Sequence, residues 1–379
     1  MSLERAKGHV IGLTHYPTKI THAGKEDDRF MSVKIPFEEL KATAKKAFLN
    51  LGLSEEQAET CATIHASSSA DGVESHGMNR IPRFAEYVRK GWINIHGSPQ
   101  LVRAKGACEN YDGQLGIGIT NALFCCERAV KLAAEHGIGL VALKNTTHWM
   151  RGGTYAWKTA EAGYIGISWI NTESCMPMWG SDTKSVGNNP FCIAIPREDG
   201  QIVVDMAMSQ YAYGKLGVYR LAGKKLPYPG GFDKDGNLTD DPGAIEDSMR
   251  ILPTGYWKGS SLAIALDLAA AAISGGICGS DMDANNNGSC TGCSQIFIAI
   301  DPYMFGDKHE TQSMFNRRVA IADTAHPIDL KHPVKCPGES TIARRNDSMK
   351  HGVNVDETIW EQVCALAEGN LDVKDKASK

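Results

Sequence analysis

Four short segments contain the histidine, arginine and carboxylate side chains that chemistry at a polar carbonyl group requires. They are SHGMNR with His76 and Arg80, NTTHWMRGG with His148 and Arg151, VVDMAMS with Asp205 and Ser209, and PGES with Gly338 and Glu339. Histidine is the side chain best suited to deliver a proton near neutral pH. A guanidinium can hold a carboxylate by two hydrogen bonds. These residue types predict binding of a small carbonyl acid and proton transfer to it.

Each of these residues also has a purely structural interpretation. A single histidine more often fills a structural position, but His76 lies in a loop next to glycine and His148 follows a strand-like run, where catalytic groups often stand. Asp205 either orients the His76 imidazole or caps a strand-to-helix turn. Arg80 stands four positions after His76, so the two side chains share a face if the segment is helical, and Arg80 then holds the substrate carboxylate. The alternative for Arg80 is an ordinary surface salt bridge.

The second histidine segment leaves two roles open for each of its polar residues. His148 is expected to polarise the carbonyl group or to contact a substrate hydroxyl. Arg151 is expected to hold a carboxylate or to stabilise the loop. Trp149 and Asn189 are expected beside them in a pocket for a long polar substrate.

Other motifs predict less. The glycine pairs Gly116/Gly118 and Gly137/Gly139 do not continue to G-x-G-x-x-G, so a nicotinamide cofactor would not bind in the Rossmann manner. Lys258 at the start of a helix would suit a phosphate. The segment DMDANNNG lacks the glycine and glutamate of a calcium loop, and Cys290 and Cys293 have no second ligand pair for zinc, so no metal site is expected.

Helix-like and strand-like patterns alternate through the middle of the chain and predict an α/β sheet of mixed strand direction. Helical spacing runs from Phe37 to Gly52, and SEEQ fits a capping box for the next helix. A short helix is expected in IPRFAEYVRKG, after His76, and a helix from Asn121 to His136 precedes the apolar run GIGLVAL. Further strand-like runs are YIGISWI, FCIAIP and QIFIAID. The polar segment 279–293 is expected to be a loop.

Composition limits the class of protein. The 379 residues carry a formal charge of −4 with dispersed cations, which argues against nucleic-acid binding. No apolar run approaches the roughly 20 residues of a membrane span, and no apolar signal core begins the chain, so we expect a cytoplasmic protein without membrane contact. The 11 cysteines lack a disulfide framework and suit reduced thiols.

The motifs SHGMNRIPRF, HGIGLVALKNTTHWMRGGTYAW, GNNPFCIAIP, VVDMAMS, LPTGYWKGSSLAIALDL and PGES resemble the malate/L-lactate dehydrogenase family of the non-Rossmann type. The resemblance covers about Met31 to Glu368. It implies a homodimeric oxidoreductase that uses NADH, with NADPH as the alternative, to reduce the carbonyl of a 2-keto acid. It also implies that His76 is the proton donor. The implied cofactor contacts are Gln201, Ile202, Val203, Val204, Asp205, Met206, Ala207, Trp257, Lys258, Gly338, Glu339 and Ser340.

The implied fold is α/β, with a mixed-sheet cofactor domain and a second domain formed by both chain ends. We assign residues 106–325 to the cofactor domain, and residues 31–105 with 326–379 to a helical substrate-side domain. Residues 1–30 are expected to be a poorly ordered or non-native extension. Within the family the alternatives are dehydrogenases of malate, sulfolactate or ureidoglycolate and reductases of cyclic imino acids. A non-catalytic ligand-binding homologue and a metal-dependent hydrolase are the alternatives of other classes.

Overall fold

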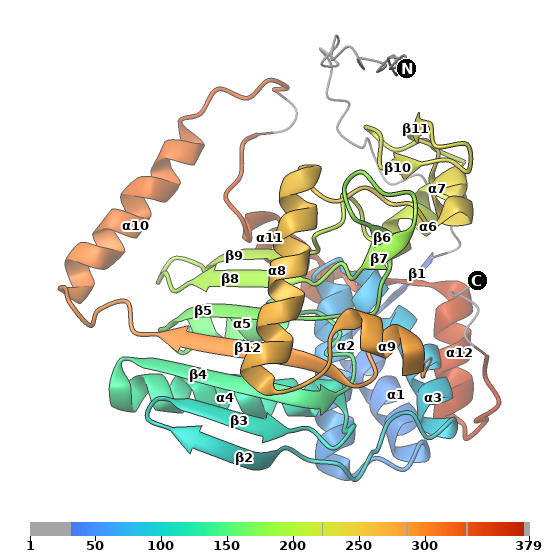
Figure 1. Ribbon diagram of the computed structural model, residues 1–379, viewed down its shortest axis with the longest axis horizontal. Coiled ribbons are helices and arrows are strands. Elements are labelled where there is room, and N and C mark those ends of the chain that lie inside the picture. The colour runs from blue at the N-terminus through green and yellow to red at the C-terminus, as the bar shows by residue number, and fades with distance from the viewer. Residues whose placement is uncertain (1–31, 222, 286, 331–332, 375–379) are drawn as a thin grey trace, which may run out of the picture.

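A seven-stranded sheet of mixed strand direction forms the centre of the molecule, in agreement with the predicted fold class (Figure 1). The computed structural model describes residues 32–221, 223–285, 287–330 and 333–374, so the expected extension 1–30 lies outside the described residues. In spatial order the strands are β2 Gln100–Lys105, β3 Cys108–Asp112, β4 Ile138–Thr146, β12 Cys293–Ile300, β5 Ile165–Ile170, β8 Phe191–Ile195 and β9 Ile202–Met206. Only β3 and β4 pair in parallel, and the other neighbours are antiparallel.

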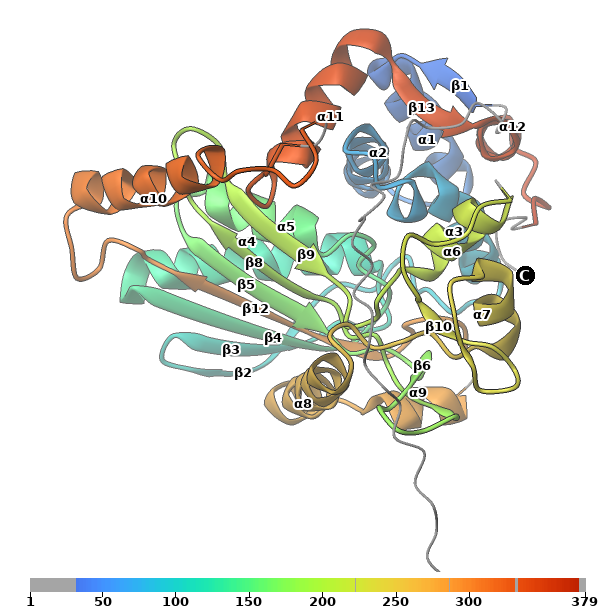
Figure 2. The same cartoon turned by 90° about the horizontal axis from the view of Figure 1, so that it is seen from above.

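Helices cover both faces of this sheet (Figure 2). The helices α4 Gly118–His136 and α5 Gly153–Glu161 pack on one face, and α8 Trp257–Ser274 packs on the other. Helix α4 ends at Gly137 in the left-handed conformation (φ 79°), which lets β4 begin at the next residue. The buried strands are therefore apolar on both faces, as the continuous run GIGLVAL indicates.

The two chain ends fold together beside the sheet. Strand β1, Ser32–Ile35, pairs antiparallel with β13, Val353–Asp356, and one apolar core joins residues of both ends. The helices of this part are α1 Phe37–Asn50, α2 Glu55–Ala70, α3 Ile81–Arg89, α11 Glu339–His351 and α12 Glu357–Ala367. The predicted capping box of α2 is present, since Ser54 and Gln57 exchange side-chain and backbone hydrogen bonds.

Several elements differ from the sequence expectation. The segment 279–293 was expected to be a loop, but it begins with the short helix α9, Gly279–Asn285, whose Asp281 and Asp283 accept backbone N–H bonds from Cys278 and Ser174. The sheet begins at Gln100, within the range assigned to the terminal domain.

Three helices and two short strand pairs outside the central sheet were also not predicted from the sequence. The remaining elements are α6 Tyr213–Leu221, α7 Pro242–Ser248, α10 Lys308–Asp323 and the two-stranded pairs β6–β7 (Met176–Pro177 with Lys184–Val186) and β10–β11 (Gly231–Phe232 with Leu238–Thr239). Helix α10 stands away from the sheet (Figure 1), and only Gln312 and Val319 are buried in it.

Among the described residues, no single helix is long and apolar enough to cross a membrane. Only the pair α8 and α9, bent by 80° at its break, meets the length and composition of a span together.

The buried histidine of α2 makes the stability of this fold sensitive to acid. His65 is fully buried, and burial lowers its pKa to about 4 from the ordinary 6.5. Between these pH values His65 is protonated in the unfolded chain and neutral in the folded chain. We therefore expect this group to remove about 1.4 kcal/mol of unfolding free energy per pH unit as the pH falls from 6.5 toward 4.

Urea unfolding between pH 7 and 5 measures this loss. His65→Asn keeps a donor for the Gly77 carbonyl, which the His65 Nδ1 contacts at 2.8 Å, and removes the titration. Its stability should fall less steeply over the same interval. An equal slope in both proteins would contradict the assignment.

Candidate active site

The segment around His76 follows helix α2 and packs against it, but it is not part of that helix. Two 3₁₀ turns, Glu74–His76 and Met78–Arg80, are separated by Gly77 (φ −100°, ψ −134°). A Cβ at Gly77 would lie 2.1 Å from the Ser69 hydroxyl, so glycine is required where the loop packs on α2. The helical segment that would place His76 and Arg80 on one face is therefore not formed. The Arg80 Nε instead donates to the Ser75 carbonyl at 2.9 Å.

His148 nevertheless lies directly against His76. The two imidazole rings stack with centroids 5.6 Å apart and an interplanar angle of 29°. The Nδ1 of His148 accepts the Met150 backbone N–H at 2.8 Å, so the neutral ring carries its proton on Nε2. Met150 adopts a positive φ of 64° in this loop, the kind of local strain that functional loops retain. The His76 Nδ1 hydrogen-bonds with the Ser75 hydroxyl at 2.9 Å.

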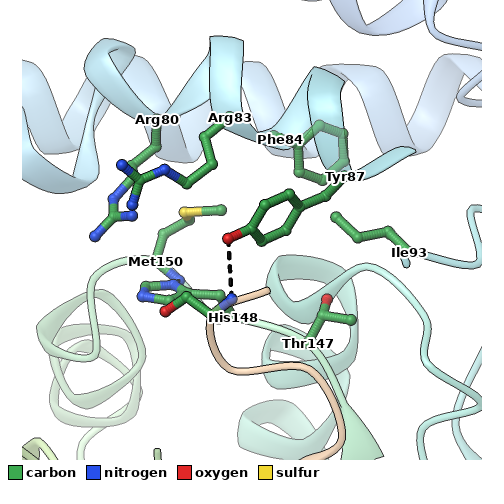
Figure 3. A pocket seen from close by; sticks show the side chains of 9 residues that line it. Arg80, Arg83, Phe84, Tyr87, Ile93, Thr147, His148 and Met150 are labelled. Carbon is green, nitrogen blue, oxygen red and sulfur yellow. Dashed lines mark hydrogen bonds between the residues drawn. The ribbon is translucent and has the colours of Figure 1, made fainter. Parts of the chain in front are cut away.

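A pocket opens between α3 and the loop that follows β4 (Figure 3). Arg80 and Arg83 extend from the α3 side toward the loop of His148. Its lining consists of Arg80, Arg83, Phe84, Tyr87, Ile93, Thr147, His148, Met150 and Ser289. This lining combines two cations with apolar and hydroxyl side chains and contains no carboxylate, which suits a small anion.

The charge around the two histidines keeps them neutral. Burial, followed by the charges of Arg80 and Arg151, lowers the pKa of His76 to about 3. Burial and the Arg80 charge also hold the pKa of His148 well below its ordinary value. Neither imidazole holds an extra proton at pH 7 before an anion enters.

Asp205 and Arg151 belong to an ion network rather than to the pocket. The Asp205 Oδ2 accepts the Gly153 N–H at 3.0 Å and lies 3.5 Å from the Arg151 Nε. Among the described residues, Asp205 has no hydrogen bond to His76. The structure thus does not form the expected Asp205–His76 pair and supports the alternative in which Asp205 caps a helix, here α5.

Arg151 is 7% exposed and pairs with the buried Asp71 as well as with Asp205. Of its two expected roles, this geometry favours stabilisation of the loop. Trp149 and Asn189 were expected in the substrate pocket and do not lie there. Trp149 packs in the core on Tyr155, and Asn189 is fully buried and bonded to the Thr172 N–H and the Ala263 carbonyl.

The three segments expected to hold the cofactor meet along the edge strand β9. The Val203 N–H donates to the Pro337 carbonyl, which places the PGES turn beside β9. At the other end of β9, the Thr254 N–H donates to the Met208 carbonyl and brings the start of α8 close.

The charge of these segments suits the phosphates of a dinucleotide. Gly338 (φ +101°) lets the PGES turn pack closely on β9, since a Cβ there would lie 2.9 Å from the Gln201 carbonyl oxygen. Trp257 and Lys258 are exposed in the first turn of α8, where a cation and free N–H groups suit a phosphate. The Glu339 side chain turns back onto the PGES turn, where its carboxylate accepts the Cys336 N–H at 3.0 Å.

Within the part of the chain that the structure describes, no group of three histidine, cysteine or carboxylate side chains is arranged to hold a metal ion. Cys290 and Cys293 are buried free thiols.

Of the pocket lining, the sequence interpretation named only Arg80 and His148, and one signal could have revealed two of the residues that it missed. Arg83 and Tyr87 are four residues apart in the predicted helix after His76, so they share the face that Arg80 begins. Ser289 lies far along the chain, and its N–H donates to the Tyr87 hydroxyl at 2.9 Å (the dashed line of Figure 3). No local pattern predicts that contact.

Comparison with known proteins identifies the family of the chain. Residues 35–364 match the family model described as malate/L-lactate dehydrogenase. The chain is 42% identical over 334 residues to the 2,3-diketo-L-gulonate reductase of Shigella boydii serotype 4, covering 88% of this chain and 100% of the relative.

Solved structures have the same fold. Sulfolactate dehydrogenase from Methanocaldococcus jannaschii superimposes with a TM-score of 0.81 at 27% identity, covering 91% of this chain and 99% of that one. The delta1-piperideine-2-carboxylate reductase from Pseudomonas syringae gives 0.78 at 26% identity, with coverages of 88% and 99%. The chain therefore belongs to the malate/L-lactate dehydrogenase family of oxidoreductases.

Proposed function

We propose that this enzyme reduces the carbonyl group of a 2-keto acid with NADH, and that 2,3-diketo-L-gulonate, reduced to 3-keto-L-gulonate, is its substrate. The observation that carries the proposal is the stacked pair of His76 and His148 beside Arg80 and Arg83. Reduction of a carbonyl adds a hydride to carbon and a proton to oxygen. Arg80, Arg83 and His148 line the pocket, and His76 stacks on His148 behind this lining, so an anion site and a proton donor are close to each other.

In this mechanism the arginines hold the substrate carboxylate and His76 delivers the proton. The cations that lower the pKa of His76 lose much of their effect when a carboxylate binds between them. Substrate binding then raises the pKa of His76, so the proton enters with the anion. His148, with its proton on Nε2, donates a hydrogen bond to the carbonyl oxygen or to a neighbouring hydroxyl.

The cofactor lies along β9 in this proposal, between the PGES turn and the start of α8. When bound, the nicotinamide supplies the hydride. The backbone of Gln201 to Ala207 and of Gly338 to Ser340 holds the dinucleotide, and Lys258 pairs with a phosphate. We propose NADH over NADPH on the likeness to the diketogulonate reductase, and a homodimer on the likeness to the family.

The choice of substrate rests on the 42% identity over the whole length of the diketogulonate reductase. Malate-type, sulfolactate-type and cyclic imino acid substrates would use similar cations, and the sulfolactate and piperideine-carboxylate enzymes share the fold. A panel of 2-keto acids followed by NADH absorbance tests the proposal. The highest kcat/KM should belong to 2,3-diketo-L-gulonate. NADH binding without turnover of any member of the panel would favour the non-catalytic alternative.

Substitution of each arginine identifies the one that holds the carboxylate. We expect Arg80→Lys to raise KM about 10- to 100-fold, because a lysine loses one of two charge-assisted hydrogen bonds of roughly 1.5–3 kcal/mol. The measurement is KM and kcat with saturating NADH. Arg83→Lys is the matched comparison on the next turn of the segment. If only Arg83→Lys raises KM, the carboxylate site belongs to Arg83.

A further inference from the structure

We infer that Arg345 and Asp71 form a positioning link that makes cofactor binding at the PGES turn strengthen keto-acid binding beside His76. The inference rests on the proposed function, because it takes the dinucleotide to bind at this turn and the keto acid to bind between the arginines. It assigns a role to two residues that lie in neither site. Three contacts in series carry it.

The first contact ties the PGES turn to the sheet. Helix α11 begins at Glu339, inside this turn, and the Pro337 carbonyl accepts the Val203 N–H of β9. Further along α11, Ile342 packs on the apolar cluster of α5, β8 and β9. A ligand that orders the turn against β9 therefore also orders the first turns of α11.

The second contact joins α11 to the end of α2 (Figure 2). The Arg345 guanidinium donates to both oxygens of Asp71, from Nε at 2.7 Å and from Nη2 at 2.8 Å. The guanidinium also lies over the Trp157 ring of α5, with its carbon 4.9 Å from the ring centroid. Two parallel hydrogen bonds and a stacked ring fix its orientation, so α11 and Asp71 hold one relative position.

The third contact carries this position to both histidine loops. Asp71 is the C-cap of α2, and the His76 turn begins three residues later, at Glu74. Its carboxylate, 3% exposed, also pairs with Arg151, which follows His148 by three residues. One buried carboxylate thus orients the segments of both stacked imidazoles.

The charged side chains between the two sites are the buried Asp71 and Arg151 and the partly buried Arg345, which makes their arrangement discrete. A buried carboxylate that loses one of its cations is strongly disfavoured, so Asp71 and Arg345 move together. Binding at the turn favours the arrangement in which α11 is docked. The same arrangement aligns the two histidine loops for the keto acid. Both ligands therefore bind the docked arrangement with higher affinity, and this difference in affinity couples the two sites.

Equilibrium binding of oxamate, an unreactive analogue of a 2-keto acid, tests the link without turnover. In the unaltered enzyme, saturating NADH should lower the oxamate Kd by a factor within the usual range of about 5 to 150. In Arg345→Gln this factor should fall close to 1, while the Kd for NADH alone changes little. Arg345→Lys keeps a cation beside Asp71 and should give an intermediate factor.

Lys350→Gln is the control, because it removes one positive charge from the exposed side of the same helix. It should keep the full factor. Circular dichroism establishes that each variant is folded, and the lysine variant decides the result if Arg345→Gln does not fold.

The inference is overturned if the unaltered enzyme binds and oxidises NADH but its oxamate Kd is the same with and without NADH, or if Arg345→Gln keeps the full factor. Failure of the proposed function looks different. The unaltered enzyme would then bind no NADH or would reduce no keto acid.

Discussion

His76→Asn should lower kcat for keto-acid reduction by about 10²- to 10⁴-fold, the contribution that a positioned general acid makes. Asparagine can still hydrogen-bond with the Ser75 hydroxyl, which contacts the imidazole Nδ1 at 2.9 Å, but it cannot deliver a proton. Because His76 does not lie on β9 or in the PGES turn, the Kd for NADH should remain within about a factor of two, a change worth less than 0.5 kcal/mol. Steady-state kinetics and NADH fluorescence titration measure the two quantities.

The exposed His96 provides the matched control, since His96→Asn makes the same chemical change outside the pocket. It should leave kcat unchanged. If His76→Asn keeps most of the turnover, His76 is not the proton donor. His148→Asn would then be the variant to examine, because its Nε2–H faces the same region beside the stacked ring.

Asp71→Asn should lower the free energy of unfolding by about 3–5 kcal/mol, because it removes the carboxylate that pairs with both the buried Arg151 and the partly buried Arg345. Arg151 is 7% exposed and Arg345 35% exposed, and both pair with this carboxylate. An amide can accept a hydrogen bond but brings no charge. Urea unfolding at pH 7 measures the change.

Two comparisons separate the loss of this buried pair from a general loss of charge. Asp199→Asn removes a carboxylate that is 71% exposed and 3.7 Å from Arg197, and it should cost about 0–1 kcal/mol. Asp71→Asn combined with Arg345→Gln removes one of the stranded cations, so it should unfold at a higher urea concentration than Asp71→Asn alone. Equal unfolding midpoints for Asp71→Asn and Asp199→Asn would contradict a structural role for the network.

The same ion network also explains why the Asp205 carboxylate does not contact His76. Asp205, on a strand far along the chain, was expected to orient the His76 imidazole. The structure uses this carboxylate to cap α5 and to pair with Arg151. The neighbours that dominate the charge at His76 are arginines. The site therefore depends on the substrate anion, and not on a protein carboxylate, to favour the protonated imidazole.

Local sequence patterns predicted most of the sheet and several of its helices. The apolar runs GIGLVAL, YIGISWI, FCIAIP and QIFIAID correspond to β4, β5, β8 and β12, since strands buried on both faces need apolar residues throughout. The capping box at Ser54 began α2 as predicted, because a cap is a contact within one turn. The helix after His76 and the start of α8 at Lys258 follow from the same short-range rules. The family motifs pointed to His76, Arg80 and His148, and the fold brings these three residues together.

Contacts between distant segments could not be read from those patterns. The sequence contains Asp71, Arg151 and Arg345 separately, but nothing in their spacing shows that one buried carboxylate holds both cations. It contains Asp205 and His76, and only the register of β9 beside α5 decides that the carboxylate faces Gly153. Trp149 stands between the pocket residues His148 and Met150 in sequence, yet its side chain packs in the core, and Asn189 is also fully buried. Residue type and short-range spacing fixed which chemistry is present, whereas the packing of the two chain ends against the sheet decided which groups can act together.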